Sequence, residues 1–392
     1  MDRTILHCDC NGFYASVECA LRPELRNVPM AVGGDRESRH GIILAKNELA
    51  KKYDIRTAET IYQALKKCPE LVVVPPQHSV YREFSERINE IYRRYTDLVE
   101  PFSIDESWLD VTESRLLFGD GKKIADELRA AVRDETSVTI SVGVSFNKVF
   151  AKLGSDYKKP DATTVISREN WKEILFPLPA SYMLYVGGAT SKTLSSLGIR
   201  TIGDLANAGD ALLTSRLGKL GHTLYLYSNG LDESPVKSIY DKREIKSVGN
   251  GTTFPKDISG EEEIRREVLS LSDSIAVRMR RHGLKCTTVQ VQIKTPQFRI
   301  ISRQKKLDSP TYSARIIGGT AMDIIRASWN MSSPIRMITV TGSGLIPENA
   351  VAEQLSFFDD DTPKKQDELE KTMDSLRKKF GGSKINFGYN IE

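Results

Sequence analysis

The sequence lacks long apolar runs: no stretch approaches the roughly 20 consecutive apolar residues that a membrane-spanning helix needs. It does not start with a basic segment followed by an apolar one, so we expect no secretory signal peptide. Cysteines are few, five in 392 residues, and none has Cys-x-x-Cys spacing. Cys8 and Cys10 flank Asp9, but two thiols without a second pair make a poor zinc site. These absences predict a cytoplasmic protein that has no membrane-spanning helix and no disulfide bonds.

Charge is nearly balanced overall but unevenly distributed. Residues 1–242 carry 32 basic and 33 acidic residues, and residues 347–392 carry 7 and 10. Residues 243–346 carry 17 basic and only 9 acidic residues. That excess indicates a polyanion-binding module, with a solvated basic surface as the alternative. The length predicts two to four domains.

Asp105 and Glu106 are adjacent carboxylates before a strand-like run. Neighbouring side chains of a strand point to opposite faces, so both acids can serve one site only at a bend. Pro101 and Ser103 suit a hairpin turn that ends at these acids. The pair requires a third carboxylate and a divalent metal to form a site, and Asp9 is the candidate. Solvated turn acids are the alternative.

The first half of the chain predicts an α+β sheet with helices on one face. Asn11 is expected to cap the first helix with its side chain. The other expected elements are strands over 4–8 and 138–144, a hairpin at residue 105, and helices over 80–98 and 119–133.

Residues 170–232 predict a helical, glycine-punctuated region. The run Val186-Gly-Gly-Ala189 is typical of a helix-hairpin-helix, and Leu217-Gly-Lys-Leu-Gly221 is a weaker copy. Backbone amides of such a glycine turn can bind a phosphate. An ordinary helical bundle explains the pattern equally well.

Residues 246–342 predict a βαββαβ domain. Val289, Val291 and Ile293 alternate with polar residues, so one face of the sheet should pack on the helices. The other face is expected to be open to a phosphate backbone. Its expected basic contributors are Arg299, Arg303, Lys305, Lys306 and Arg336.

The C-terminal stretch combines a short aromatic motif with a helix. Gln354-Leu-Ser-Phe-Phe358 places two aromatics in an acidic stretch, which suggests a docking peptide. A helix over 366–380 follows, with Gly381-Gly382 closing it. Its apolar face is expected to dock on something, through Leu369, Met373, Leu376 and Phe380.

Several motifs, in this order, resemble those of the Y-family DNA polymerases, most nearly the bacterial DNA polymerase IV group. They are Asp9 followed by Phe13-Tyr14, Ser103-Ile-Asp-Glu106, Gly143-Val-Ser-x-Asn-Lys-x-x-Ala-Lys152 and Lys159-Pro160. The resemblance covers residues 1 to about 345. It implies a right-hand fold with a palm (1–10 and 77–166), fingers (11–76), a helix-hairpin-helix thumb (167–233), a linker (234–245), a βαββαβ little finger (246–346) and a tail (347–392).

The resemblance implies template-directed DNA synthesis of low fidelity and low processivity, including synthesis past damaged bases. Asp9, Asp105 and Glu106 would be the catalytic carboxylates, and with the backbone carbonyl of Cys10 they would bind two Mg²⁺ ions, which Mn²⁺ could replace. Two metals suit an in-line phosphoryl transfer, because they clamp the attacking and leaving oxygens. The expected substrates are primer–template DNA and dNTPs.

The resemblance also implies nucleotide contacts. Tyr14, five residues after Asp9, matches the family's steric gate against ribonucleotides, and its neighbour Phe13 is expected to be a core residue at the start of the helix. Lys159 matches the basic residue on the triphosphate. Where the family often has Thr, Tyr and Arg, this chain has Ala45, Glu48 and Lys51. Asn11 replaces a frequent second Asp, and Thr190 replaces a glycine of the thumb turn.

Partners follow from the same resemblance. Gly188 and Lys246 are expected to join the basic residues named above in binding DNA. Gln354, Leu355, Phe357 and Phe358 match the pentapeptide that binds the sliding clamp. We expect a bacterial cytoplasmic monomer that associates with the nucleoid when engaged.

Three other functions remain as alternatives. One is a relative of the same family that needs accessory subunits for activity. Another is a non-catalytic DNA-binding scaffold, which the presence of three carboxylates and Tyr14 disfavours. A palm-type nucleotide cyclase would account for the acids but would have no use for the second half of the chain.

Overall fold

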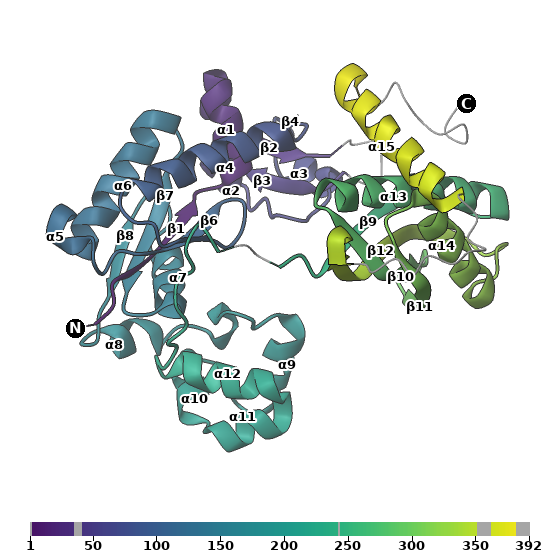
Figure 1. Cartoon of the computed structure of the whole chain (residues 1–392). Coiled ribbons are helices and arrows are strands. Elements are labelled where there is room, and N and C mark those ends of the chain that lie inside the picture. Colours follow the sequence, from purple (N-terminus) through teal and green to yellow (C-terminus); the bar gives the residue numbers. More distant parts are fainter. Residues whose placement is uncertain (1, 35–40, 242–243, 351–361, 382–392) are drawn as a thin grey trace. The chain divides into compact units, whose positions relative to one another are not determined.

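The protein is described by a computed structural model, in which residues 2–34, 41–241, 244–350 and 362–381 can be described (Figure 1). The chain forms two compact units, one within residues 1–242 and one within residues 243–392. In the described part of the chain, no helix combines the length and apolar character that a membrane crossing requires.

The core of unit 1 is a five-stranded sheet built around its first strand. The order is β5-β6-β1-β7-β8, and β1 pairs antiparallel with both β6 and β7. All six residues of β1 are buried, because apolar side chains on both faces of the strand meet helices. The strands are β1 (Ile5–Cys10), β5 (Val99–Pro101), β6 (Glu106–Asp110), β7 (Ile140–Ser145) and β8 (Thr163–Ile166).

Helices cover both faces of this sheet, so the expectation of one covered face is wrong. α4 (His78–Arg93) and α6 (Gly121–Thr136) share a core with Leu6, Leu109 and Val142. α7 (Lys148–Tyr157) crosses the opposite face over Gly143 of β7. A Cβ at Gly143 would lie 1.9 Å from the Ala151 carbonyl oxygen, so only glycine allows this crossing. The short helix α5 (Arg115–Phe118) precedes α6.

A smaller sheet is inserted between β1 and α4. Its strands are β2 (Met30–Gly33), β3 (Ile43–Lys46) and β4 (Val72–Val74), in the order β3-β2-β4. The accompanying helices are α1 (Phe13–Leu21), η1 (Pro23–Asn27), α2 (Glu48–Lys51) and α3 (Ile61–Lys67).

The predicted capping role of Asn11 is wrong. Gly12 is the residue before α1, with φ +56°, and no side chain caps this helix. The side-chain nitrogen Nδ2 of Asn11 instead donates to Thr139 Oγ1 at 3.1 Å, and its side-chain oxygen Oδ1 accepts from Ser141 Oγ at 2.9 Å. The strand-to-helix junction is therefore fixed to the start of β7 by a side chain and turned by a glycine.

The third part of unit 1 is helical. Its core contains Leu194, Leu205, Leu213 and Leu224, and it continues into Phe150 of α7. Gly187 precedes α9, and Gly218 separates α11 from α12. The elements are α8 (Trp171–Leu175), η2 (Ala180–Tyr182), α9 (Gly188–Ser196), α10 (Ile202–Asn207), α11 (Asp210–Leu217) and α12 (Lys219–Ser228).

Residues 234–241 then return to the five-stranded sheet. Val236 is buried with Trp108. Nearby, the Lys148 ammonium lies 2.7 Å from the Glu100 carboxylate and 4.4 Å from the centre of the Trp108 ring. Glu100 also accepts the backbone amide of Lys237 at 3.0 Å. The chain is thus held on unit 1 by both burial and a paired charge.

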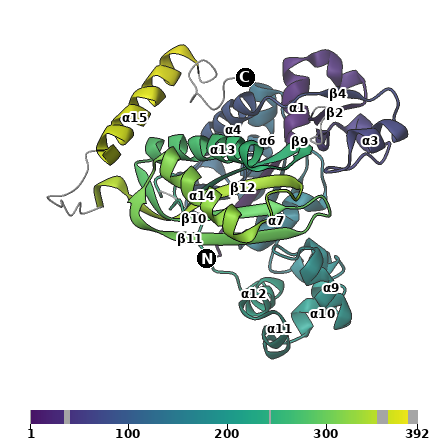
Figure 2. The same cartoon turned by 90° about the vertical axis from the view of Figure 1, so that its right-hand side faces the viewer.

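Unit 2 has the predicted βαββαβ order. The sheet order is β11-β10-β12-β9, with α13 and α14 on one face (Figure 2). Val289, Val291 and Ile293 are buried beneath these helices, as their alternation predicted. The elements are β9 (Ser247–Ile258), α13 (Glu261–Arg281), β10 (Leu284–Lys294), β11 (Ile300–Thr311), α14 (Ala314–Ser328), β12 (Ile335–Pro347) and η3 (Glu348–Ala350).

The C-terminal helix α15 (Thr362–Phe380) packs on the rest of unit 2 through charged side chains, and the apolar face that was expected to dock stays largely exposed. Glu370 is 1% exposed and accepts from Ser313 Oγ at 2.9 Å and from the Ala314 amide at 3.1 Å, which caps α14. Arg280 pairs with Glu370 and with Asp374. Among the four apolar residues named above, Leu369, Leu376 and Phe380 stay exposed.

Replacing Gly143 with alanine should lower the free energy of unfolding of unit 1 by about 1–3 kcal/mol, because the methyl group would overlap the α7 backbone. Urea denaturation followed by fluorescence in a Trp329→Phe background measures this, since Trp108 and Trp171 both lie in unit 1. Gly187→Ala is the control, because nothing lies within 4 Å of its Cβ position. Equal stability of the two variants would contradict the close crossing.

Candidate active site and nucleic-acid interface

The predicted carboxylates meet at the end of β1. Asp9 is the direct cross-strand partner of Glu106, so their side chains share one face of the sheet. The predicted hairpin is confirmed: β5 and β6 pair antiparallel, and Asp105 lies in the turn between them. The Cys10 amide donates to the Asp105 carbonyl at 2.9 Å, and Ser103 Oγ donates to the Asp105 carboxylate at 2.6 Å. These bonds and the strand pairing therefore bring Asp9, Asp105 and Glu106 to the same end of β1, where all three line one cavity.

Two lysines neutralise this acidic cluster. The Lys159 ammonium lies 2.7 Å from the Asp9 carboxylate and 2.6 Å from that of Asp156. The Lys152 ammonium lies 2.9 Å from Glu106 and 4.0 Å from Asp9. Lys152 stands in a quoted motif, but no role was predicted for it. In the sequence, the spacing of Lys152 and Asp156 by one helical turn was the feature that could have indicated a charged contact for this lysine.

Burial raises the pKa of Asp9 to about 7, Lys159 opposes this shift, and neighbouring Glu106 adds to it. In the described residues, no group of three His, Cys, Asp or Glu side chains is already arranged to hold a metal ion, and ammonium groups contact Asp9 and Glu106. Oxygen donors from buried carboxylates are the ligands that hard divalent cations prefer. The residues present therefore fit such a cation.

A cavity of about 410 Å³ extends from these carboxylates to the smaller sheet. Tyr14 of α1 lines it and stacks on Tyr81, with ring centroids 4.2 Å apart and planes at 16°. Phe13 also contributes to the lining but is only 3% exposed and belongs to the core. Of the two neighbours Phe13 and Tyr14, Tyr14 is therefore the one whose ring is exposed to the cavity beside the carboxylates.

The same cavity is lined by three lysines. They are candidates for the contacts to a triphosphate that the sequence did not identify. Lys51 and Lys159 were predicted, whereas Lys46 of β3 was not. Lys46 donates to Thr57 Oγ1 at 3.1 Å, and burial lowers its pKa. Glu48 pairs with Lys51 and is not among the lining residues. Its carboxylate therefore does not face the cavity.

In unit 2, strand register divides the predicted basic residues between two faces. Arg303 is the partner of Val291, and Lys305 is the partner of Val289, so both lie on the face that the helices cover. The Lys305 ammonium accordingly lies 3.9 Å from Asp323 of α14. The expectation that both line the open face is wrong. Lys306, the partner of Thr288, does lie on the open face.

Small neutral side chains dominate the open face. Thr339 and Thr341 of β12 lie there beside Gly251 and Gly249 of β9. A Cβ at Gly249 would lie 2.5 Å from Thr341 Oγ1, and one at Gly251 would lie 2.3 Å from Thr339 Oγ1. Gln290, Gln292, Ser302 and Gln304 continue the face, and Lys294 and Lys306 supply its positive charge. The face is therefore rich in hydrogen-bonding groups and moderately basic.

The other predicted contacts are placed as follows. Gly188 opens α9 and is exposed, and Lys246 is exposed just before β9. Arg299 lies in the β10–β11 turn, where the guanidinium of Arg336 covers the ring of exposed Phe298 at 4.6 Å. The clamp-binding residues Gln354, Leu355, Phe357 and Phe358 lie outside the described residues.

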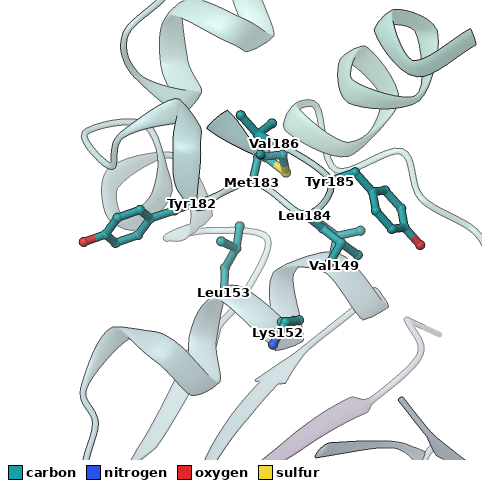
Figure 3. A pocket seen from close by; sticks show the side chains of 9 residues that line it. Val149, Lys152, Leu153, Tyr182, Met183, Leu184, Tyr185 and Val186 are labelled. Atoms are coloured by element: carbon teal, nitrogen blue, oxygen red, sulfur yellow. The ribbon is translucent and has the colours of Figure 1, made fainter. Parts of the chain in front are cut away.

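A second cavity, of about 320 Å³, lies between α7 and the segment before α9 (Figure 3). Leu153, Val149 and Lys152 border it from α7, whereas the rings of Tyr182 and Tyr185 point away from it. Its walls are largely aliphatic, and Lys152 is the charged residue in its lining. The chemistry of the carboxylates therefore belongs to the first cavity.

Comparisons with known proteins identify the family of the chain. The profile of the impB/mucB/samB family matches residues 8–156, and that of the impB/mucB/samB family C-terminal domain matches residues 245–357. A solved structure of a Y-family DNA polymerase chimera, Dbh-Dpo4(243-245)-Dbh, superposes with a TM-score of 0.78. It covers 88% of this chain and 99% of its own chain at 22% identity, and it confirms the fold.

Curated relatives match over nearly their whole length. DNA polymerase IV of Acetivibrio thermocellus is 48% identical over 100% of this chain and 98% of its own. DNA polymerase IV of Clostridium acetobutylicum is 36% identical over 98% and 97%, and DNA polymerase IV 1 of Bacillus subtilis is 36% identical over 100% and 94%. The chain therefore belongs to the Y-family of DNA polymerases, in the DNA polymerase IV group, and is a DNA-directed DNA polymerase of the translesion class.

Proposed function

We propose that Asp9, Asp105, Glu106 and the backbone carbonyl of Cys10 hold two Mg²⁺ ions for nucleotidyl transfer. The observation that carries this proposal is the pairing of Asp9 with Glu106 across β1 and β6, with Asp105 tied to Cys10 at 2.9 Å. The ions would lower the pKa of the primer 3′-hydroxyl and neutralise the triphosphate. Polymerases of this family depend on a metal, which agrees with the buried acidic cluster.

The lysines then have two successive partners. Without a cation, Lys159 and Lys152 balance the charge of Asp9 and Glu106. When a cation takes that place, the Lys159 ammonium becomes free to bind the triphosphate, together with Lys46 and Lys51 at the far side of the cavity. Three ammonium groups compensate for the absence of the arginine that the family often has, although without its two-pronged geometry.

The nucleotide sugar would rest on Tyr14. Its ring is fixed from behind by Tyr81, so it cannot easily yield to a ribose 2′-hydroxyl. Phe13 supports the helix start from the core. Tyr14 is thus the steric gate of this proposal.

Primer–template DNA would bind the open face of the unit 2 sheet. Threonine and serine hydroxyls, glutamine amides and the two lysines of that face suit the phosphate backbone, which carries no sequence information. Gly188, Lys246, Arg299 and Arg336 remain predicted contacts. Clamp recruitment through residues 354–358 and a monomeric state remain predictions from the sequence.

Asp105→Asn should reduce primer extension by at least about a hundredfold, the scale on which losing one preorganised electrostatic contact acts. Extension of a defined primer with Mg²⁺ and single dNTPs measures this, beside a gel-shift assay of DNA binding. Asp134→Asn is the control, because that carboxylate is exposed on α6. Extension by neither wild type nor control, with DNA binding intact, would favour the accessory-dependent relative or the scaffold.

Tyr14→Ala should lower the preference for dNTPs over rNTPs by about 10- to 200-fold, because the ring no longer meets the 2′-hydroxyl. Steady-state kcat/KM for paired deoxy- and ribonucleotides gives this ratio. Tyr14→Phe keeps the ring and should keep the preference. A ratio unchanged in Tyr14→Ala would assign the gate elsewhere.

Lys306→Ala should weaken primer–template binding uniformly across sequences and reduce the slope of log K against log salt by about 1. Fluorescence anisotropy at several salt concentrations measures both. Lys305→Ala is the matched control, because this adjacent lysine faces α14 and its loss should leave the slope unchanged. The opposite ranking would place DNA on the helix side.

A further inference from the structure

His7 lies directly behind the carboxylate cluster. It precedes Asp9 by two residues on β1, so both side chains project from the same face of the strand. The imidazole is fully buried and packs edge-on against Trp108, with ring centroids 5.2 Å apart. Its Nε2 atom lies 3.9 Å from Glu106 Oε2 and has no hydrogen-bond partner among the described residues. A buried polar atom without a partner is destabilising, so its presence here calls for a reason.

The neighbouring hydroxyl decides which ring nitrogen carries the proton. His7 Nδ1 and Ser155 Oγ are 2.8 Å apart, and the single hydroxyl proton of Ser155 can go either to His7 Nδ1 or to the Lys152 carbonyl oxygen, to which Oγ is placed to donate at 2.8 Å. That carbonyl lies inside α7, where it already accepts a backbone amide one turn later. The hydroxyl can therefore donate to His7 Nδ1 at little cost. The ring proton is then on Nε2 and points at the Glu106 carboxylate. With the other tautomer, the Nε2 lone pair would face a carboxylate oxygen, and two acceptors would repel each other.

The Glu106 carboxylate has a basic group on each side: the Lys152 ammonium lies 2.9 Å from Oε1, and His7 Nε2 lies 3.9 Å from Oε2. If a cation displaces Lys152, the imidazole is the contact that stays with the carboxylate.

We propose that His7 is a positioning residue for Glu106: its Nε2–H donates to Glu106 Oε2 once a divalent cation is bound, and fixes the carboxylate orientation that the cation needs. The contact on the other side of the ring, between Ser155 Oγ and His7 Nδ1, sets the tautomer and the rotation of the imidazole. Such outer contacts orient ligands without touching the reacting atoms. This inference rests on the metal site of the proposed function.

The first test uses the wild-type chain. Long-range ¹H–¹⁵N NMR of histidine-labelled protein distinguishes ring tautomers, and the chain has five histidines, so comparison with His7→Gln assigns the signal. We expect a neutral Nε2–H tautomer for His7, with the Nε2 proton moving downfield when Mg²⁺ and dTTP are added. A Nδ1–H tautomer, or no change on addition, overturns the proposal.

The second test compares two amides of different length. The side-chain nitrogen of glutamine can occupy the place of Nε2, whereas that of asparagine replaces only Nδ1. We expect His7→Asn to weaken Mn²⁺ binding about 10- to 100-fold, measured by electron paramagnetic resonance with dTTP and without DNA, and His7→Gln to retain most of it. Thermal melting of both variants checks folding. Equal loss in both, or no loss in His7→Asn, overturns the proposal.

Asp105→Asn separates this inference from the proposed function. If it abolishes Mn²⁺ binding while His7→Asn leaves binding intact, the metal site stands and the role of His7 falls. If Asp105→Asn leaves Mn²⁺ binding unchanged, the metal site itself falls.

Discussion

The active site depends on an electrostatic constraint: two carboxylates stand side by side on paired, buried strands and must be neutralised. β1 and β6 bring Asp9 and Glu106 together whether or not a ligand is present, since the register is set by backbone hydrogen bonds. Ionised carboxylates in such a place need opposite charge close by. Lys152 and Lys159 supply it from α7 and the turn after it, which ties the proposed catalytic site to the crossing of α7 over β7 at Gly143.

Sequence reasoning located the parts of the site that depend on local pattern. The hairpin before Glu106 and the βαββαβ order follow from turn residues and alternation, which are short-range signals. Asn11 was assigned a cap because caps are the commonest use of asparagine at a helix start, but contacts with Thr139 and Ser141, far along the chain, decide its side chain. Lys46 was missed for a similar reason, because only the folded chain brings it to the cavity.

Strand register and helix docking were beyond the sequence. The sequence shows that Arg303 and Lys305 share one face of β11. Which face that is depends on the register between β11 and β10, and this register shifts near Cys286. The apolar stripe of α15 pointed to hydrophobic docking, yet Glu370 finds the free amide at the start of α14 and Arg280 beside it. A helix end that lacks a cap can thus recruit a charged side chain from elsewhere in the chain.

If primer–template DNA binds the open face of the unit 2 sheet as proposed, the glycines of β9 have a consequence for movement along the template. An enzyme that adds one nucleotide per cycle must release its grip and restore it one base pair further on. On the face around Gly249 and Gly251, threonine hydroxyls are short, and the backbone lies almost level with them. Contacts of that kind are nearly equivalent at every register, so neither a strong preference for one base nor a deep energy minimum would oppose each step.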